Sequence, residues 1–235
     1  EGGGSLNLRV APVAPELRVT AKQVVSIGDE RLVVGVNFTV DISRAGVFQV
    51  SFPLPDGLEV ESLSGTALRH WTELTEGGKR FVILHFNGKT IGSQQFALSM
   101  AGPAPKPDAK GWLVPRFELR EANRQTGELI MKPTMGIQIE TRERRNVSEI
   151  DPRSVGGQGE GDLAYRILQR ACELRLVIEK LEPWVTGQVL HELTLREGQT
   201  RTTVATNLKV ERASISSLQV QLPGLSAEEA KTVRA

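Results

Sequence analysis

Short segments in which apolar and polar residues alternate are the feature that most constrains the fold of this chain. Residues 31–40 (RLVVGVNFTV) and 47–52 (VFQVSF) repeat with a period of two. Successive side chains of a β-strand point to opposite faces, so this period is typical of strands with one buried face. The other segments that we expect to form strands are 6–10, 58–63, 80–86, 94–100, 163–171, 174–178, 185–195, 199–210 and 217–222. Segment 163–171 also fits a helical spacing, and we favour a strand.

Segment 47–52 makes a specific prediction about its two faces. The residues expected to share one face are Phe48, Val50 and Phe52. Gln49 and Ser51 are expected to point to the other face. Pro53 is expected to end the strand, because proline has no N–H to donate to a neighbouring strand.

Glycine and proline divide the alternating segments. Turns are expected at 55–57, 76–78, 87–88 and 196–198. Among them, Asn87-Gly88 is the strongest hairpin signal, since both residue types tolerate the positive φ that a tight hairpin turn requires. Strands at this spacing, with glycine and proline turns between them, predict an all-β fold built from antiparallel, immunoglobulin-like β-sandwich units.

Two stretches are expected to connect the apolar segments. Residues 102–108 (GPAPKPD) are rich in proline, and residues 151–161 contain four glycines. Short apolar segments follow the first connector at 112–119, 128–131 and 136–140.

The chain also contains a possible internal repeat. Residues 6–15 align with 174–183 at an offset of 168, and residues 30–53 align with 200–223 at an offset of 170. The second alignment has no gap and contains these identities: Arg31/Arg201, Val34/Val204, Asn37/Asn207, Val40/Val210, Gln49/Gln219, Val50/Val220 and Pro53/Pro223. We therefore expect a partial second repeat at the C-terminal end.

This repeat suggests a domain organisation. Residues 1–5 (EGGGS) resemble a linker or a cloning scar, and 6–172 are expected to form one β-sandwich unit. A sub-boundary at 102–110 would instead divide that unit into two small sandwiches. Residues 173–235 are expected to begin a second β-sandwich unit, so the chain looks like part of a longer protein.

Composition excludes several classes of function. The net charge of +1, from 29 basic and 28 acidic residues, provides no broad electrostatic attraction for nucleic acid. No apolar stretch approaches the roughly 20 residues of a membrane span, so direct membrane insertion is not expected. The single cysteine, Cys172, excludes an internal disulfide and a multi-cysteine metal site.

Parts of the sequence resemble large uncharacterised bacterial envelope or secreted β-rich repeat proteins. The resemblance rests on residues 121–131, on 163–166 followed by 185–190, and on 52–60 (FPLPDGLEV) followed by Trp71. It implies a bacterial origin, export and β-rich modules. It also implies an extracytoplasmic location, periplasmic or at the cell surface, and it supplies no catalytic residues.

Catalytic and metal-binding candidates all have structural alternatives. The motifs of serine hydrolases, P-loop enzymes, dinucleotide-binding proteins and zinc peptidases are absent, and we expect no catalytic residues, cofactor or metal site. Cys172 is expected to be a structural thiol. The three histidines lie far apart in the sequence without ligand spacing: His70, His85 and His191.

The charged candidates are weighed in the same way. A pair of carboxylates could hydrolyse a glycosidic bond, and Asp151 with Asp162 could bind calcium, but solvated or turn roles are favoured. The carboxylates considered for hydrolysis are Asp108, Glu118, Glu121 and Glu128. The mixed-charge run containing Arg142, Arg144 and Arg145 is expected to be solvated.

Three tryptophans remain as candidates for contact with a ligand or with a neighbouring unit: Trp71, Trp112 and Trp184. A sugar-binding role for them would require an exposed flat or concave face. Structural positions in the core are favoured for Trp71. Trp184 is the best candidate for a contact between units.

These observations predict a non-catalytic structural and interaction module of a larger exported bacterial protein, acting as spacer, scaffold or adhesion unit. Its expected partners are neighbouring β-modules of the same parent chain, with a protein or carbohydrate partner also possible. The alternative is an accessory module of a larger enzyme that binds carbohydrate or another ligand. A third hypothesis, an enzyme whose site is assembled from distant residues, would require histidines or carboxylates to converge in a pocket.

Overall fold

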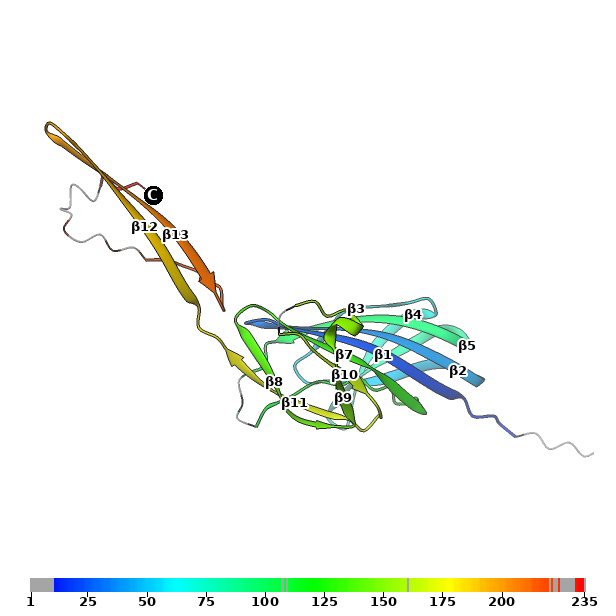
Figure 1. Ribbon diagram of the computed structural model, residues 1–235. Helices are drawn as coiled ribbons and strands as arrows, with labels where there is room; N and C mark the ends of the chain where they lie inside the picture. The colour runs from blue at the N-terminus through cyan, green and yellow to red at the C-terminus, as the bar shows by residue number, and fades with distance from the viewer. Residues whose placement is uncertain are drawn as a thin grey trace, which may run out of the picture. The chain divides into compact units, whose positions relative to one another are not determined.

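The computed structural model describes residues 11–106, 108, 110–159, 161–219, 221, 224 and 231–234. The chain divides into two units, one up to Lys180 and one from Leu181 (Figure 1). Strands dominate both, and the described residues contain a single short 3₁₀ helix, η1 (Pro152–Val155). In the described part of the chain, no helix has the length and apolar character needed to cross a membrane. The expected strand 6–10 and linker 1–5 lie outside the described residues.

The first unit contains one large and one small sheet. The strands of the large sheet are β1 (Glu16–Ile27), β2 (Arg31–Leu54), β3 (Glu59–Gly65), β4 (Leu68–Glu76), β5 (Lys79–Pro103), β7 (Arg124–Pro133), β9 (Val147–Ile150) and β10 (Leu163–Ile167). Their order is β3-β5-β2-β1-β7-β10-β9, and β4 also pairs with β5. All pairs are antiparallel except β1 with β7. The small sheet has the order β6-β11-β8, formed by β6 (Trp112–Leu113), β8 (Ile137–Arg145) and β11 (Glu173–Lys180).

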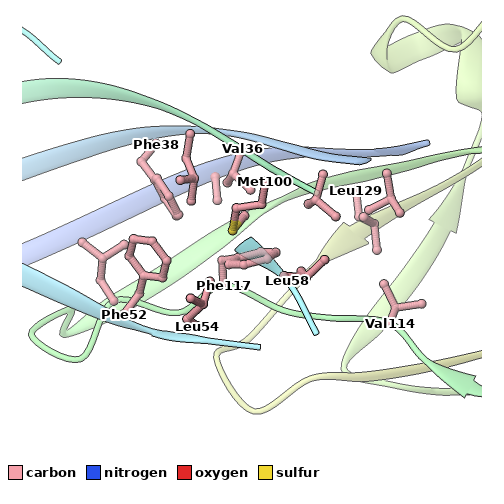
Figure 2. Packing of buried hydrophobic residues seen from close by; sticks show 14 of the residues in the cluster. Val36, Phe38, Phe52, Leu54, Leu58, Met100, Val114, Phe117 and Leu129 are labelled. Carbon is pink, nitrogen blue, oxygen red and sulfur yellow. The ribbon is translucent and has the colours of Figure 1, made fainter. Parts of the chain in front are cut away.

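Two long strands, β2 and β5, fold back over themselves. Their pairing shifts register between Ile42 and Gln49, where Arg44 has a positive φ of 66°. Phe38 lies before this bend and Phe52 after it, and their ring centroids are 6.1 Å apart. Figure 2 shows the two rings facing each other across the core. The two halves of the β2–β5 pair therefore form opposing layers.

An irregular segment, residues 114–119, completes the core between these layers. Its apolar residues Val114, Phe117 and Leu119 are buried, and Phe117 packs edge-on against Phe52 (Figure 2). Irregular backbone in a core needs hydrogen-bond partners. The buried side chain of Gln125 supplies two of them, accepting from the Leu119 N–H and donating to the Phe117 carbonyl.

The small sheet contributes to the same core. Its buried residues Ile137, Ile139, Leu174, Leu176 and Ile178 belong to the hydrophobic cluster that contains the buried face of the large sheet. The prediction of an all-β sandwich with antiparallel sheets is confirmed. Its immunoglobulin-like type stays a prediction.

The face prediction for segment 47–52 is wrong for one residue. Val50 and Phe52 are buried, but the Phe48 side chain is 64% exposed. The register shift between Val47 and Gln49 rotates Phe48 out of the core. Ser51 keeps its place on the other face, where it is also buried and bonds to Glu121.

Several boundaries differ from those expected. Asn87-Gly88 is no hairpin turn, because β5 runs through it, and β2 continues through Pro53 to Leu54. Strands β1 and β4 were not expected from the sequence. Segment 112–119 is a strand only over its first two residues, and 163–171 only over 163–167. The described residues of 217–222 form no strand.

The second unit contains the hairpin of β12 (Trp184–Arg196) and β13 (Gln199–Glu211) (Figure 1). Its turn lies at the expected 196–198 region. The sequence places the start of the second unit at residue 173, whereas the structure divides the chain after Lys180. The difference is β11, which is the central strand of the small sheet in the first unit. Whether 173–235 begin a second sandwich stays a prediction.

Candidate functional site

The β12–β13 hairpin has one apolar and one polar face. Pairing runs without a register shift from Trp184↔Glu211 to Arg196↔Gln199, so each face keeps its residues along the whole hairpin. The more apolar face carries Val185, Val189, Leu193, Leu195, Val204, Leu208 and Val210, together with Gly187, His191, Thr200, Thr202 and Thr206. The opposite face carries mainly threonine, charged and amide side chains, together with Leu190 and Trp184.

Among the residues that the structure describes, the side chains of this face are mostly exposed. Leu193 is 60% exposed and Leu195 is 71% exposed, and every residue of β12 is exposed. In most sandwich proteins the apolar face of a hairpin is buried against a second layer. Large exposed apolar patches occur at protein-binding, membrane-binding and ligand-binding surfaces.

The hairpin corresponds to β1–β2 of the first unit pair for pair. A constant offset of 168 converts Glu16↔Ser43 into Trp184↔Glu211, and Ile27↔Leu32 into Leu195↔Thr200. For β13 this offset differs by two residues from the 170 of the sequence alignment. An even difference leaves the faces unchanged, because side chains alternate with a period of two.

With the offset of 168, the core-facing residues of β1 correspond to the residues on the apolar face of β12. The inward residues of β1 are Leu17, Val19, Ala21, Gln23, Val25 and Ile27, and their counterparts in β12 are Val185, Gly187, Val189, His191, Leu193 and Leu195. In the first unit all six are at most 6% exposed. The face that is core in β1–β2 is therefore open in β12–β13.

The correspondence covers only the hairpin. The part of β2 after its bend, residues 47–54, corresponds to 215–222, whose described residues form no strand.

The first unit contains a cavity of about 640 Å³, a size typical of small-molecule sites. Most of its lining is apolar. It includes Leu32 and Leu129 of the large sheet, Leu58, Trp112 and the backbone region around Pro115. Two polar side chains at the cavity, Gln23 and Arg145, are engaged by other groups of the protein. Gln23 donates to the Pro115 carbonyl over 2.9 Å, and Arg145 pairs with Glu173 over 2.8 Å.

The three candidate tryptophans lie in different surroundings. Trp71 and Trp112 are half-buried and pack against the main core cluster, and Trp112 also lines the cavity. Trp184 is 56% exposed, and the Arg212 guanidinium lies over its ring at 5.6 Å. Trp184 is the first residue of β12, and its side chain lies on the polar face of the hairpin.

The structure brings two of the three histidines together. His70 and His85 are cross-strand partners in β4 and β5, and their rings stack with centroids 4.5 Å apart. His191 lies in the hairpin. Sequence spacing misses the pair because the two residues are joined only by strand register.

The candidate carboxylates are engaged by separate partners. Glu118 pairs with Arg170 at 2.5 Å, and Glu128 lies 3.7 Å from Arg166. Glu121 bonds to Ser51, and Asp108 accepts from the Lys110 N–H. Within the described ranges, no three His, Cys, Asp or Glu side chains come together in an arrangement that could hold a metal ion.

Asp151 and Asp162 have turn-forming roles in the structure. Asp151 caps η1 by accepting from the Arg153 N–H, and Asp162 accepts from the N–H groups of Gln158 and Gly159.

The two remaining candidates are Cys172 and the arginine run. Cys172 is half-buried and lines the cavity. Burial raises the pKa of its thiol, partly opposed by the Arg116 guanidinium, and a neutral thiol is a poor nucleophile. In the run, all three arginines are exposed, and Arg144 pairs with Glu149 at 3.0 Å.

Comparison with known proteins gives a structural likeness only. No family model matches the chain, and no curated protein matches it. Among solved structures, it is similar to an M1 zinc metallopeptidase from Deinococcus radiodurans bound to a Tyr-Ser-Ala substrate, with a TM-score of 0.42 and 12% identity over 93% of this chain. A two-domain M1 zinc metallopeptidase bound to L-tryptophan matches with a TM-score of 0.43 and 9% identity over 90% of this chain. The chain spans about half the length of these structures, 52% and 51%.

Proposed function

We propose that this protein is a non-catalytic structural and interaction module of a larger exported bacterial protein, acting as spacer, scaffold or adhesion unit. It joins a neighbouring β-module of the same kind through the apolar face of the β12–β13 hairpin. The observation that carries this proposal is the exposure of an apolar face whose counterpart in β1–β2 is core.

The energetics favour a covered hairpin. A two-stranded hairpin alone is marginally stable in water. Complete burial of a valine or leucine side chain contributes about 1.5–3 kcal/mol, so covering several of them stabilises the hairpin and the contact together. Both outer edges of the hairpin also present backbone groups that can pair with a further strand.

The occupant is a second β-module with the same face. The apolar face carries valine and leucine with threonine and one histidine, and no Asp, Glu, Lys or Arg, so it suits another apolar sheet face better than a charged partner. Two such hairpins, packed face to face, reproduce the two-layer arrangement that buries β1–β2 in the first unit. A second copy of this chain presents that face and serves as the probe.

The experiment is sedimentation velocity of the whole chain over a concentration series. We expect wild type to self-associate as concentration rises, and the double variant Leu193→Thr, Leu195→Thr to stay monomeric. Leu190→Thr is the matched control, because Leu190 lies on the same strand, is 68% exposed and points to the polar face. Wild type that remains monomeric throughout, or Leu190→Thr that abolishes association equally, contradicts the proposal.

The cavity supports a second candidate function, a ligand-binding accessory module of a larger enzyme. Its apolar lining and half-buried Trp112 suit a ligand with an apolar or ring face, including a sugar ring.

The test uses an anilinonaphthalene dye and a glucose oligosaccharide as probes, in the Leu193→Thr, Leu195→Thr background so that the hairpin offers little apolar surface. Leu113→Arg should block binding, because Leu113 lines the cavity and is 49% exposed. Leu74→Arg, at a site of similar exposure outside the cavity lining, should leave binding unchanged. Absence of binding by either probe, or equal loss in both variants, rejects this second function.

A further inference from the structure

We propose that His70 and His85 form a binding site for a divalent metal ion that prefers imidazole ligands, with Zn²⁺ as its simplest representative. The site lies on the β4–β5 pair in the first unit and is independent of the hairpin contact. It is formed by strand register alone, which places the two residues directly opposite each other.

The two rings lie close together, but in the stacked arrangement their nitrogen lone pairs lie in nearly parallel planes and do not meet at one point. Their centroids are 4.5 Å apart and their planes differ by 13°. Zinc–nitrogen bonds are about 2.0–2.1 Å long, so two nitrogens can share one ion when they are within about 4 Å of each other. Binding of one ion therefore requires the exposed His70 ring to unstack and turn about its side-chain bonds, so that one of its nitrogens points at an ion held by the half-buried His85.

A neighbouring hydroxyl group supports metal binding by His85. The Nε2 atom of His85 lies 2.9 Å from the Oγ1 atom of Thr72. When Nε2–H donates to this hydroxyl oxygen, the lone pair of Nδ1 is free for a ligand. Metal-binding histidines commonly use their second nitrogen in this way, as a donor that fixes the ring orientation.

By the alternation of the β4–β5 register, the ion pair of Arg80 and Glu73 lies on the face opposite to the two histidines, while Arg69 directly precedes His70 in the chain. Arg80 of β5 is held by Glu73 of β4 at 2.8 Å and by Glu59 at 2.7 Å. On the other side of His85, the register partner in β2 is the neutral Gln49. Two histidines supply two ligands, and water would complete the coordination of an exposed ion.

The experiment follows the imidazole resonances by NMR while Zn²⁺ is added to the whole chain at mildly alkaline pH. We expect His70 and His85 to shift together and to saturate at one Zn²⁺ per chain. His191 is the internal control and should not shift. His70→Ala or His85→Ala should each weaken binding at least about tenfold, and Thr72→Val should weaken it more than Thr72→Ser.

Two results overturn the proposal. One is the absence of any joint shift of His70 and His85 at a large excess of Zn²⁺. The other is binding that survives both alanine variants or that moves His191 to the same degree. Far-UV circular dichroism of each variant establishes that the sheet is intact, since both histidines lie on the surface side of their strands. Loss of self-association in the Leu193→Thr, Leu195→Thr variant has no bearing on this site, so the two proposals can fail separately.

Discussion

The Glu121 carboxylate accepts two hydrogen bonds from Ser51, one from its backbone N–H and one from its hydroxyl, each 2.8 Å long. The neighbouring Arg120 N–H donates to the Ser51 carbonyl over 2.8 Å. These bonds satisfy backbone groups of β2 beyond its bend, where β5 is the strand paired with it. Residues 120–121 thereby protect a sheet edge that would otherwise invite pairing with another chain.

Replacement of this carboxylate should destabilise the first unit. Glu121→Ala leaves the nearly buried Ser51 N–H and hydroxyl without their acceptor, which costs about 1–3 kcal/mol in the free energy of unfolding. Urea unfolding measures the change. Glu179→Ala, which removes an exposed carboxylate of β11, is the control and should change stability by less than about 0.5 kcal/mol. Equal effects of the two substitutions contradict this role.

Gly127 allows β1 and β7 to approach closely. A Cβ atom at this position would lie 2.0 Å from the carbonyl oxygen of Ala21, its parallel partner. Gly127→Ala should therefore lower the free energy of unfolding by about 1–3 kcal/mol or more, because the backbone itself must move.

Gly35 is the matched control for this substitution. It lies inside β2, and its Cβ position has no atom within 4 Å. Gly35→Ala should stabilise the fold by about 0.4–1 kcal/mol, since alanine loses less chain entropy on folding. Thermal unfolding of both variants tests the pair, and a similar loss in each would exclude the close approach as the cause.

The only tyrosine of the chain, Tyr165, should titrate at unusually high pH. Burial raises the pKa of its phenol above the ordinary 10.0, while the 2.7 Å hydrogen bond to Thr141 partly opposes the shift. The folded state then holds the proton more tightly than the unfolded state. Its contribution to stability is complete below about pH 10 and is lost as pH rises through the folded pKa.

Absorbance at alkaline pH measures this directly, because tyrosinate absorbs at longer wavelength than the neutral phenol. We expect the midpoint to lie above 10.0 in the folded chain and to return to that value in urea. Tyr165→Phe supplies the blank. A folded-state midpoint at or below that of the unfolded chain would show that the phenol is solvated.

Cys172 should react slowly with alkylating reagents. Burial raises the pKa of its thiol above the ordinary 9.0, so the reactive thiolate forms at higher pH than in an unfolded chain. The pH profile of the alkylation rate by iodoacetamide should have its midpoint above 9.0 in buffer and near it in urea. A midpoint below 9.0 would indicate an activated thiol instead of a structural one.

The period-two pattern predicted many buried residues well, and it failed where the chain departs from regular pairing. The inward residues of β2 from Leu32 to Val40 follow the alternation of segment 31–40. Phe48 does not, because an irregular register at the bend rotates it to solvent. Such shifts depend on how two long strands fold over each other, which local patterning does not specify.

Tertiary contacts can also override a strong local turn signal. Asn87-Gly88 favours a hairpin turn, yet β5 passes through it on its way from β4 to β3, with the Asn87 N–H donating to the Ala67 carbonyl. The turn of the β4–β5 hairpin is made by Gly77 and Gly78, both with positive φ. In the other direction, β1 was missed because Ala21 and the buried Gln23 interrupt its apolar pattern.

The sequence by itself determined the β-strand content, the positions of several turns and the two faces of each regular strand, since these depend on side-chain period and on glycine and proline chemistry. The internal repeat stays a prediction, because the sequence aligns the second strands of the two hairpins, β2 and β13, at an offset of 170 and the strand register gives 168. Tertiary structure alone decided that the apolar face of β1–β2 is covered and that of β12–β13 open, and that His70 meets His85. Burial of a sheet face and pairing between strands both depend on contacts between residues that are distant in sequence. A local sequence pattern does not specify those contacts.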